Sequence, residues 1–335
     1  MAGPQKYDTD TDLMRTLAAL GVVTIHCAAI NTFSGVFFNG IARFSVPVFV
    51  IISGYYMLAR KPDGGRLARK CVRLFALMLF WSAVYYGTDL LRDVRAFDGP
   101  GAALTYLFTE PVHLWYLYAT ITLYLFTPLF AVFTEHASRA EYRYALALAF
   151  FFGSPVVILV RSGWIPILST ILDKMKVPYL LGMAFMYLLG GYLQRYGLES
   201  PRLRGALYGL GAAGAAMTVA GTRWIQANGG DAELLLSFFA PAVIAQGAAV
   251  FVFCKYFLRG HPVRSGKLRA AVRFLAEDTM GIYLAHPLVI TVLRPVPMPA
   301  SAGLTIVLRS LLVFAVSAAA VSILRMIPIL RRTVS

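Results

Sequence analysis

The amino-acid sequence predicts an all-α polytopic membrane protein with about ten transmembrane helices and both termini in the cytoplasm. Three observations predict this class. Of the 335 residues, 59% are hydrophobic and 14% are charged, whereas ordinary soluble domains are about 25% charged. Apolar runs close to the bilayer-spanning length of about 20 residues recur along the chain. Lys and Arg residues cluster in the short loops between those runs.

The first five candidate spans are apolar runs separated by polar or basic loops. Span 12–32 follows a polar N-terminal tail, and span 41–59 ends at a densely basic loop. Span 74–90 begins where that loop ends. Span 112–133 opens with aromatic residues, which are typical of membrane interfaces, and span 142–160 follows another basic loop.

The remaining five candidate spans complete the chain. They cover 178–194, 205–221, 234–257, 274–292 and 302–324, with a dense basic loop after the third of them. The tails at residues 1–11 and 325–335 are short, and no loop is long enough for a soluble domain. The sequence therefore predicts a single transmembrane domain over residues 1–335.

The distribution of basic residues predicts the orientation. Most of them follow even-numbered spans, and the positive-inside rule places those loops in the cytoplasm of a cell membrane. The net charge of +15 is compatible with nucleic-acid binding. Its division among membrane loops argues against that class, so the expected surroundings are the lipid bilayer, without nucleic acid.

The first span carries charged and titratable residues, which are costly inside a bilayer and indicate function. Arg15 lies about one turn into the span, and His26 lies about 16 Å further along the axis on the same helical face. Asp12 joins Arg15 at the i, i+3 spacing. A structural alternative is that Arg15 snorkels to the nearby interface or that these groups pair between helices.

Several motifs resemble the membrane-bound acyltransferase 3 family. In TDLMRTLAALGVVTIH, the residues Asp12, Arg15 and His26 match the family's first-helix pattern. SVPVFVIISGYYML resembles its second helix, with a Ser-Gly pair at Ser53. RLARKCVRLF is similar to its Arg-x-x-Arg stretch, and HLWYLYATITLYLFTPLF and GIYLAHPLV resemble its fourth and penultimate helices. The resemblance extends over nearly the whole chain.

The resemblance implies an integral membrane O-acyltransferase in its short, stand-alone form. Such enzymes move an acyl group, here expected to be acetyl, from cytoplasmic acyl-CoA to a hydroxyl of a cell-surface glycan or its lipid-linked precursor. The resemblance also implies that Arg15 and His26 are essential. No metal and no permanently bound cofactor is expected, and acetyl-CoA is a donor substrate.

The chemistry of acyl transfer suits these residue types. An imidazole with an ordinary pKa of about 6.5 can serve as the base for an acceptor hydroxyl, which favours His26. Arg15 stays protonated and is expected to contact the donor, with Asp12 orienting it. Coenzyme A phosphates need cations, and two registers of the basic motif offer them, Arg66 with Arg69 or Lys70 with Arg73. These four residues could equally be topology determinants.

Further residues are candidates for acceptor binding or support. His286 is followed by Pro287 in the ninth span, which loosens the helix there. Trp115 could be a sugar platform or an interfacial belt residue. The full set of supporting candidates is His286, Tyr283, His113, Trp115, Glu110, Arg309 and Ser53.

Alternatives remain open at this stage. A transporter of a small polar or glycan substrate would also have interior charges, although no internal symmetry is visible. A membrane sensor or scaffold is a further alternative. For the enzyme, direct transfer competes with a transient acyl-histidine on His26. A succinyl donor would need an additional cation, for which Arg43 and Arg309 are candidates.

Overall fold

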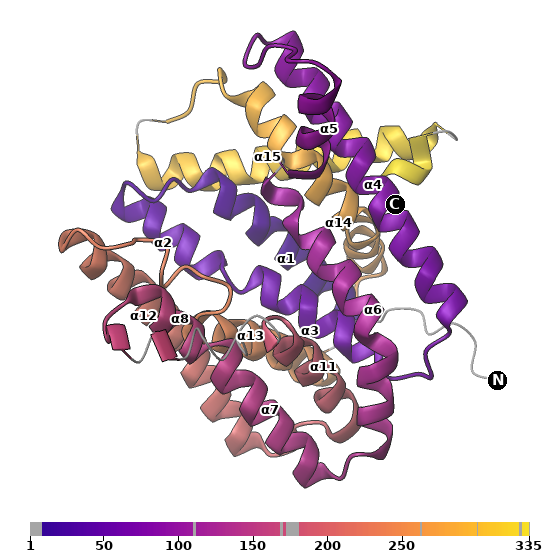
Figure 1. The fold of residues 1–335 in the computed structure, drawn as a ribbon, viewed down its shortest axis with the longest axis vertical. Coiled ribbons are helices and arrows are strands. Elements are labelled where there is room, and N and C mark those ends of the chain that lie inside the picture. The colour runs from indigo at the N-terminus through magenta and orange to yellow at the C-terminus, as the bar shows by residue number, and fades with distance from the viewer. Residues whose placement is uncertain are drawn as a thin grey trace.

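The apolar runs form helices in the computed structural model (Figure 1). The structure describes residues 9–109, 112–167, 170–171, 181–261, 263–299, 301–327 and 330–334, and this part contains no strand. Short 3-10 turns cover Val112–Leu114 and Leu330–Thr333. The α-helices are α1 (Thr9–Cys27), α2 (Phe33–Ala42), α3 (Ser45–Met57), α4 (Gly64–Leu91), α5 (Pro100–Thr109), α6 (Trp115–His136), α7 (Arg139–Gly153), α8 (Pro155–Ser162), α11 (Ala184–Tyr196), α12 (Pro201–Ala227), α13 (Pro241–Gly260), α14 (Gly266–Leu293) and α15 (Ala302–Met326).

Six helical segments of the described chain are long and apolar enough to cross a membrane. They are Phe33–Met57, Gly64–Leu91, Trp115–His136, Arg139–Ser162, Pro241–Leu258 and Ala302–Met326. The other expected spans also overlap helices, although the start of 178–194 lies outside the described residues. Two of the helices outside the six, α1 and α14, carry several charged side chains. The expected total of ten transmembrane helices therefore stays a prediction.

The boundary between the first two spans differs from the expected one. The first helix ends at Cys27 instead of residue 32, and the second helical segment begins at Phe33 instead of residue 41. Thr32 caps α2, because its hydroxyl accepts a hydrogen bond from the Gly35 N–H at 3.0 Å. The prediction was wrong here because the hydrophobic run hid this capping signal.

The second helical segment is broken between α2 and α3. Arg43 and Phe44 lie outside both helices. Pro47 has no N–H to donate to the carbonyl of Arg43, four residues earlier, which explains the interruption. The break therefore determines the position from which the Arg43 side chain extends.

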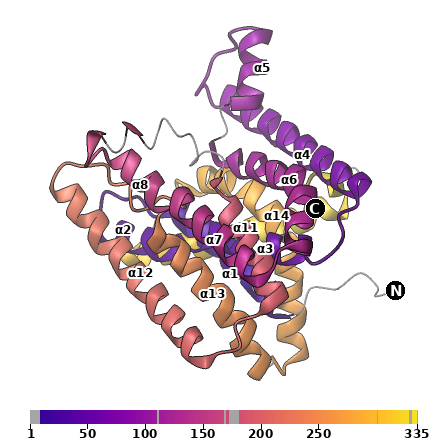
Figure 2. The same ribbon diagram turned by 60° about the horizontal axis from the view of Figure 1, so that its bottom comes forward.

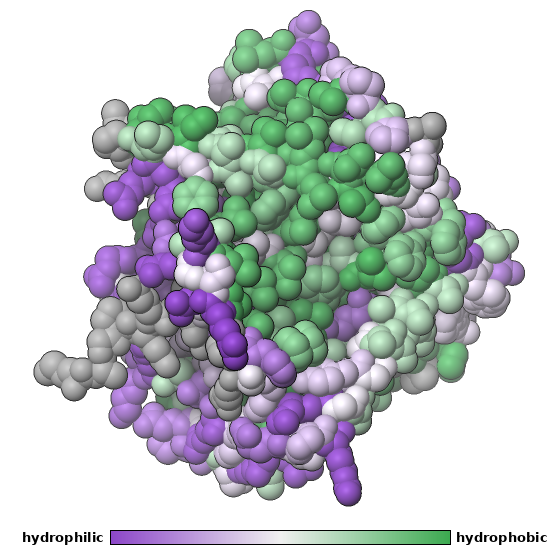
Figure 3. Space-filling view, turned by 180° about the vertical axis from the view of Figure 1, so that it is seen from behind, coloured by the Kyte–Doolittle hydropathy of each residue, from purple (hydrophilic) through white to green (hydrophobic). Residues whose placement is uncertain are grey.

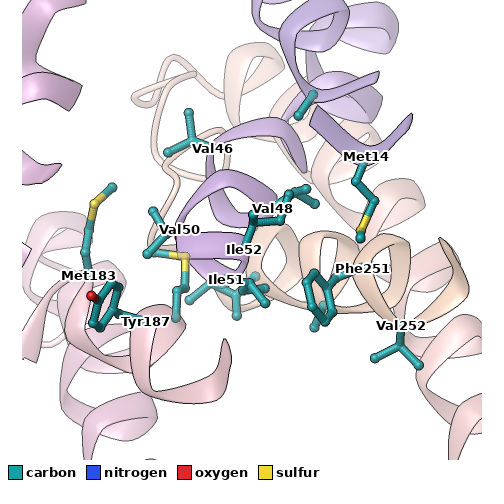
Figure 4. Packing of buried hydrophobic residues seen from close by; sticks show 14 of the residues in the cluster. Met14, Val46, Val48, Val50, Ile51, Ile52, Met183, Tyr187, Phe251 and Val252 are labelled. Carbon is teal, nitrogen blue, oxygen red and sulfur yellow. The ribbon is translucent and has the colours of Figure 1, made fainter. Parts of the chain in front are cut away.

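Helix α3 forms the centre of the bundle. The labelled side chains of α3 lie between those of α11 and those of α13 (Figure 4), and Val48, Ile51 and Tyr187 are fully buried. Glycines allow close contact, because a Cβ at Gly190 would lie 2.1 Å from the Ile51 carbonyl oxygen. Helices α11 and α3 are therefore in direct backbone contact at Gly190, as small residues permit in membrane proteins.

Large hydrophobic side chains also cover the outside of the protein. Leu125, Leu129 and Val132 of α6 are each at least 60% exposed. On the face seen in Figure 3, hydrophobic residues fill the centre and hydrophilic residues gather along the lower and left edges. Such an apolar exterior suits a protein that is surrounded by lipid.

Candidate active site

Helices α1 and α14 carry the candidate site. Near one end of the pair, Arg15 Nη2 donates a hydrogen bond to Thr279 Oγ1 at 3.2 Å. Toward the other end, the ring of His26 lies 5.0 Å from the ring of His286, centroid to centroid. Since both residue numbers increase between the two contacts, the helices run in the same direction. They hold Arg15 and His26 on one face, as the helical spacing predicted.

Arg15 lines a cavity of about 160 Å³, which we call the Arg15 cavity. Polar groups from four other helices face the same space. Its lining residues are Arg15, Val22, Val46, Phe49, Ile52, Ser53, Tyr56, Met57, Lys70, Tyr116, Thr120, Tyr124, Thr279, Met280 and Tyr283. The predicted supporting residues Ser53 and Tyr283 therefore share this space with Arg15.

His26, His113 and His286 form a histidine cluster next to the Arg15 cavity. The ring of His286 lies 6.0 Å from that of His113. Its Nδ1 lies 2.8 Å from the carbonyl oxygen of Tyr283, so that nitrogen is the donor and Nε2 carries the lone pair. The Nε2 atoms of His113 and His286 are buried and have no hydrogen-bond partner within the part of the chain that the structure describes. The cluster therefore offers free nitrogen atoms for a polar group that enters it.

His26 itself is accessible, although it lies against a fully buried histidine. Its side chain is exposed, whereas His286 has 0% exposure. His26 also lies at the penultimate position of α1. It therefore faces open space at the end of its helix, where an incoming acceptor could contact it.

Two tyrosines separate the Arg15 cavity from the histidine cluster. Tyr116 and Tyr283 line the cavity, and their rings lie 5.8 Å apart. The ring of Tyr283 also lies 6.1 Å from that of His286. Val22, one helical turn before His26, lines the cavity as well. The two halves of the site are thus adjacent, and His26 is not among the cavity-lining residues.

A second cavity of about 200 Å³ lies next to the Arg15 cavity, with which it shares the lining residues Tyr56, Met57 and Lys70. We call it the basic cavity. Its lining residues are Tyr56, Met57, Arg60, Lys61, Pro62, Asp63, Arg66, Leu67 and Lys70. The backbone N–H of Arg66 donates to Asp63 and, with nearby guanidinium groups, lowers the pKa of that carboxyl group. The cavity therefore combines a capped helix start with four cationic side chains.

The basic cavity divides the four predicted donor-binding residues. Arg66 and Lys70, one turn apart on α4, line it, whereas Arg69 and Arg73 line neither cavity. Neither of the two sequence registers is therefore reproduced as a pair. Arg60 and Lys61 also line the basic cavity. They were not among the predicted donor-binding residues, because they precede the Arg-x-x-Arg motif.

We expect Arg66→Gln to raise the KM for acyl-CoA about tenfold, because a charge-assisted phosphate contact contributes about 1.5–3 kcal/mol. The matched control is Arg69→Gln. It replaces an arginine three residues further along α4 that lines neither cavity. It should leave KM within about twofold. Steady-state kinetics with varied acyl-CoA measures both, and equal effects would contradict the assignment of the basic cavity.

The remaining predicted residues occupy several positions. The ring of Trp115 stacks on Phe238 with centroids 5.6 Å apart. Arg309 Nη2 donates to the carbonyl oxygen of Val296 at 3.3 Å and lines neither cavity. Asp12 is buried at 7% exposure on α1. Glu110 lies outside the described residues.

The possible cation for a succinyl donor is not found in the Arg15 cavity. Arg43 donates to Asn39 Oδ1 at 2.8 Å and lies over the Phe238 ring at 5.0 Å. Neither Arg43 nor Arg309 lines the cavity. Neither of the two arginines predicted to bind a succinyl group therefore contributes its charge to the Arg15 cavity.

The sequence analysis also missed a buried ion pair beside the site. Lys255 Nζ lies 2.9 Å from Asp10 Oδ2, and their side chains are 8% and 13% exposed. Lys255 also donates to Thr11 Oγ1 at 3.2 Å, and Thr11 is 2.7 Å from the hydroxyl of Tyr56, which lines both cavities. The pair anchors the start of α1. No local signal marks it, because its partners lie on α1 and α13.

The fold and the site together define a helical protein with membrane-spanning segments, in which one helix carries an arginine that lines a cavity and an accessible histidine beside a histidine cluster. The model of the acyltransferase 3 family, described as an acyltransferase domain, matches residues 8–326. The chain belongs to this family, and its membership supports membrane acyltransferase activity. No curated protein and no solved structure matches the chain.

Proposed function

We propose that the protein transfers an acetyl group from cytoplasmic acetyl-CoA to a hydroxyl of a cell-surface glycan or of its lipid-linked precursor. The adjacency of the Arg15 cavity and the basic cavity carries this proposal. Their shared lining residues bring four cationic side chains next to the cavity that holds the intramembrane arginine. The exposed His26 lies one helical turn after Val22, which lines the Arg15 cavity.

The donor enters from the basic cavity. Arg66, Lys70 and Arg60 bind the phosphates of coenzyme A, because guanidinium and ammonium groups pair well with phosphate oxygens. The pantetheine arm extends into the Arg15 cavity. Arg15, held by Thr279, then donates hydrogen bonds to the thioester carbonyl oxygen and stabilises the negative charge that develops there.

The transfer step takes place between the two tyrosines and the histidine cluster. The acceptor hydroxyl oxygen attacks the thioester carbon, a C–O bond forms, and the C–S bond breaks. A ring nitrogen of His26 takes the hydroxyl proton as the general base. The thiolate of coenzyme A leaves through the basic cavity and takes up a proton. His286 and His113 contact the acceptor or orient His26.

The orientation follows from the same arrangement. The basic cavity faces the cytoplasm, where acyl-CoA is found, and the positive-inside rule assigns the dense basic loops to that side. Both termini then lie in the cytoplasm of a multi-pass protein of the cell membrane. The acceptor reaches His26 from the opposite side.

The test is the release of free coenzyme A from acetyl-CoA by the purified protein, with and without the Arg15→Gln substitution. We expect slow turnover by the unmodified protein and a loss of about 100-fold or more in the variant, as when an oxyanion donor is removed. Arg269→Gln, an exposed change on α14 outside both cavities, is the control and should retain activity.

Two results would contradict the proposal. Absence of both turnover and binding with acetyl-CoA and succinyl-CoA would favour a transporter. Turnover that is unchanged in Arg15→Gln would keep the enzyme and remove Arg15 from the transfer step.

A further inference from the structure

A groove that is larger than the Arg15 cavity and the basic cavity lies away from the candidate active site. It has a volume of about 740 Å³ and lies among α7, α11, α12 and α13, which Figure 2 shows side by side. Its lining is aliphatic and aromatic except at one end, where Arg143 and the hydroxyl of Tyr192 are found. None of the residues assigned to acyl transfer lines it.

The floor of this groove is made of small residues. Ala213 and Gly214 of α12 face Ala242, Ala245 and Ala248 of α13. A Cβ at Gly214 would lie 2.6 Å from the Ala242 carbonyl oxygen, so the helices meet closely there. Larger side chains flank these small residues on both sides and line the rest of the groove.

The groove is long compared with a small-molecule site. Along α12 its lining residues extend from Leu203 to Met217, a rise of about 21 Å. The hydrocarbon core of a bilayer is about 30 Å thick, so the groove is longer than one leaflet. These dimensions suit a long alkyl chain.

One end of the groove is basic. Arg143, in the first turns of α7, lines it and pairs with no acidic side chain among the described residues. Arg139 Nε donates to the hydroxyl of Tyr192 at 3.2 Å, which adds a second positive charge at this end. At the opposite end the lining residues, Met217 and Pro241, are uncharged. A cationic end followed by a long apolar channel matches a phosphate headgroup followed by an acyl chain.

We propose that this groove is a binding site for an anionic phospholipid of the surrounding bilayer. One acyl chain lies along α12 over the small-residue floor, and the phosphate contacts Arg143. Basic pockets between transmembrane helices on the cytoplasmic side bind anionic headgroups in this way. In the orientation proposed above, the lipid belongs to the cytoplasmic leaflet.

The site is connected to the core of the protein. Ile244, Ala248 and Val252 line the groove and also belong to the core cluster that surrounds α3. Helix α3 carries Ser53 of the Arg15 cavity. A bound lipid therefore contacts α13 on the side of that helix facing the groove and stabilises the packing of α13 against α3.

The experiment measures thermal unfolding of the full-length protein in detergent with added phosphatidylglycerol or phosphatidylcholine, together with native mass spectrometry of retained lipid. We expect phosphatidylglycerol to stabilise the protein at lower concentration than phosphatidylcholine does. Arg143→Gln should weaken its apparent affinity about fivefold, since one cation near an anionic lipid contributes about 1 kcal/mol. Arg202→Gln, an exposed arginine of α12 that does not line the groove, should not change it.

A second variant tests the apolar part of the site. Ala245→Phe places a large side chain over the small residues of the groove and should abolish retention of the phospholipid. If Ala245→Phe folds poorly, Arg143→Gln still tests the proposal. Equal effects of the two lipids, or an unchanged affinity in Arg143→Gln, would overturn the proposal. Retention of a polyprenyl phosphate in place of a phospholipid would overturn it as well.

Discussion

Replacing His26 with glutamine is expected to reduce the rate of coenzyme A release at saturating acetyl-CoA by about 10²- to 10⁴-fold, the usual contribution of a general base. Glutamine keeps a polar side chain of similar length and removes the basic nitrogen. Because the side chain is exposed at the end of α1, the fold should tolerate the change. Donor binding should persist, since His26 lines neither cavity.

The control for this prediction is another exposed histidine at the end of a helix. His136 lies at the last position of α6, and its Nδ1 is 2.9 Å from the Val132 carbonyl oxygen. His136→Gln should retain full activity. Retention of activity by His26→Gln would instead exclude His26 as the base. An acetyl adduct on His26 without acceptor would identify the acyl-histidine route.

A second large effect is expected at Gly190, where α11 crosses α3. A Cβ there would lie 2.1 Å from the Ile51 oxygen and 2.6 Å from the Tyr55 nitrogen. Both are backbone atoms, so the helices themselves must separate. We expect Gly190→Ala to destabilise the protein by about 3 kcal/mol, the upper part of the usual range for overpacking. Its activity should fall too, because α3 carries Ser53.

The measurement is the apparent melting temperature in detergent together with the monodisperse fraction after size exclusion. Gly205→Ala is the control, because a Cβ at that glycine of α12 would meet no other part of the described chain within 4 Å. It should be neutral or stabilising by up to about 1 kcal/mol, from the higher helix propensity of alanine. Similar destabilisation by both substitutions would show that helix contact at Gly190 is unimportant.

The sequence was informative where a single helix determines the geometry. The spacing of Arg15 and His26 placed them on one face of α1, and the structure confirms this face through the contacts with Thr279 and His286. The basic motif was expected in a loop before residue 74, and this was wrong, because α4 already begins at Gly64 and contains the whole motif. Which of its side chains line the basic cavity depends on how α4 packs. Arg69 and Arg73 could not be separated from Arg66 and Lys70 by spacing alone.

Contacts between side chains on different helices could not be predicted from the sequence. The partners Asp10 and Lys255 lie on different helices, so no local pattern in the sequence connects them. The early end of α1 did have a local signal in the Thr32 cap, which the uninterrupted hydrophobic run outweighed. The barrier formed by Tyr116 and Tyr283 depends on the approach of α6 to α14 and has no local sequence signature.

The pairing of α1 with α14 also has a consequence for biosynthesis. The partners Arg15 and Thr279 are separated by 264 residues. At about 5–20 residues per second, a ribosome needs roughly 13 to 53 s to make that stretch. During this interval the nascent chain already contains the basic loop, while Arg15 and His26 await their partners. A chain that terminates before α14 would therefore have the basic residues of α4 but lack the partners of Arg15 and His26.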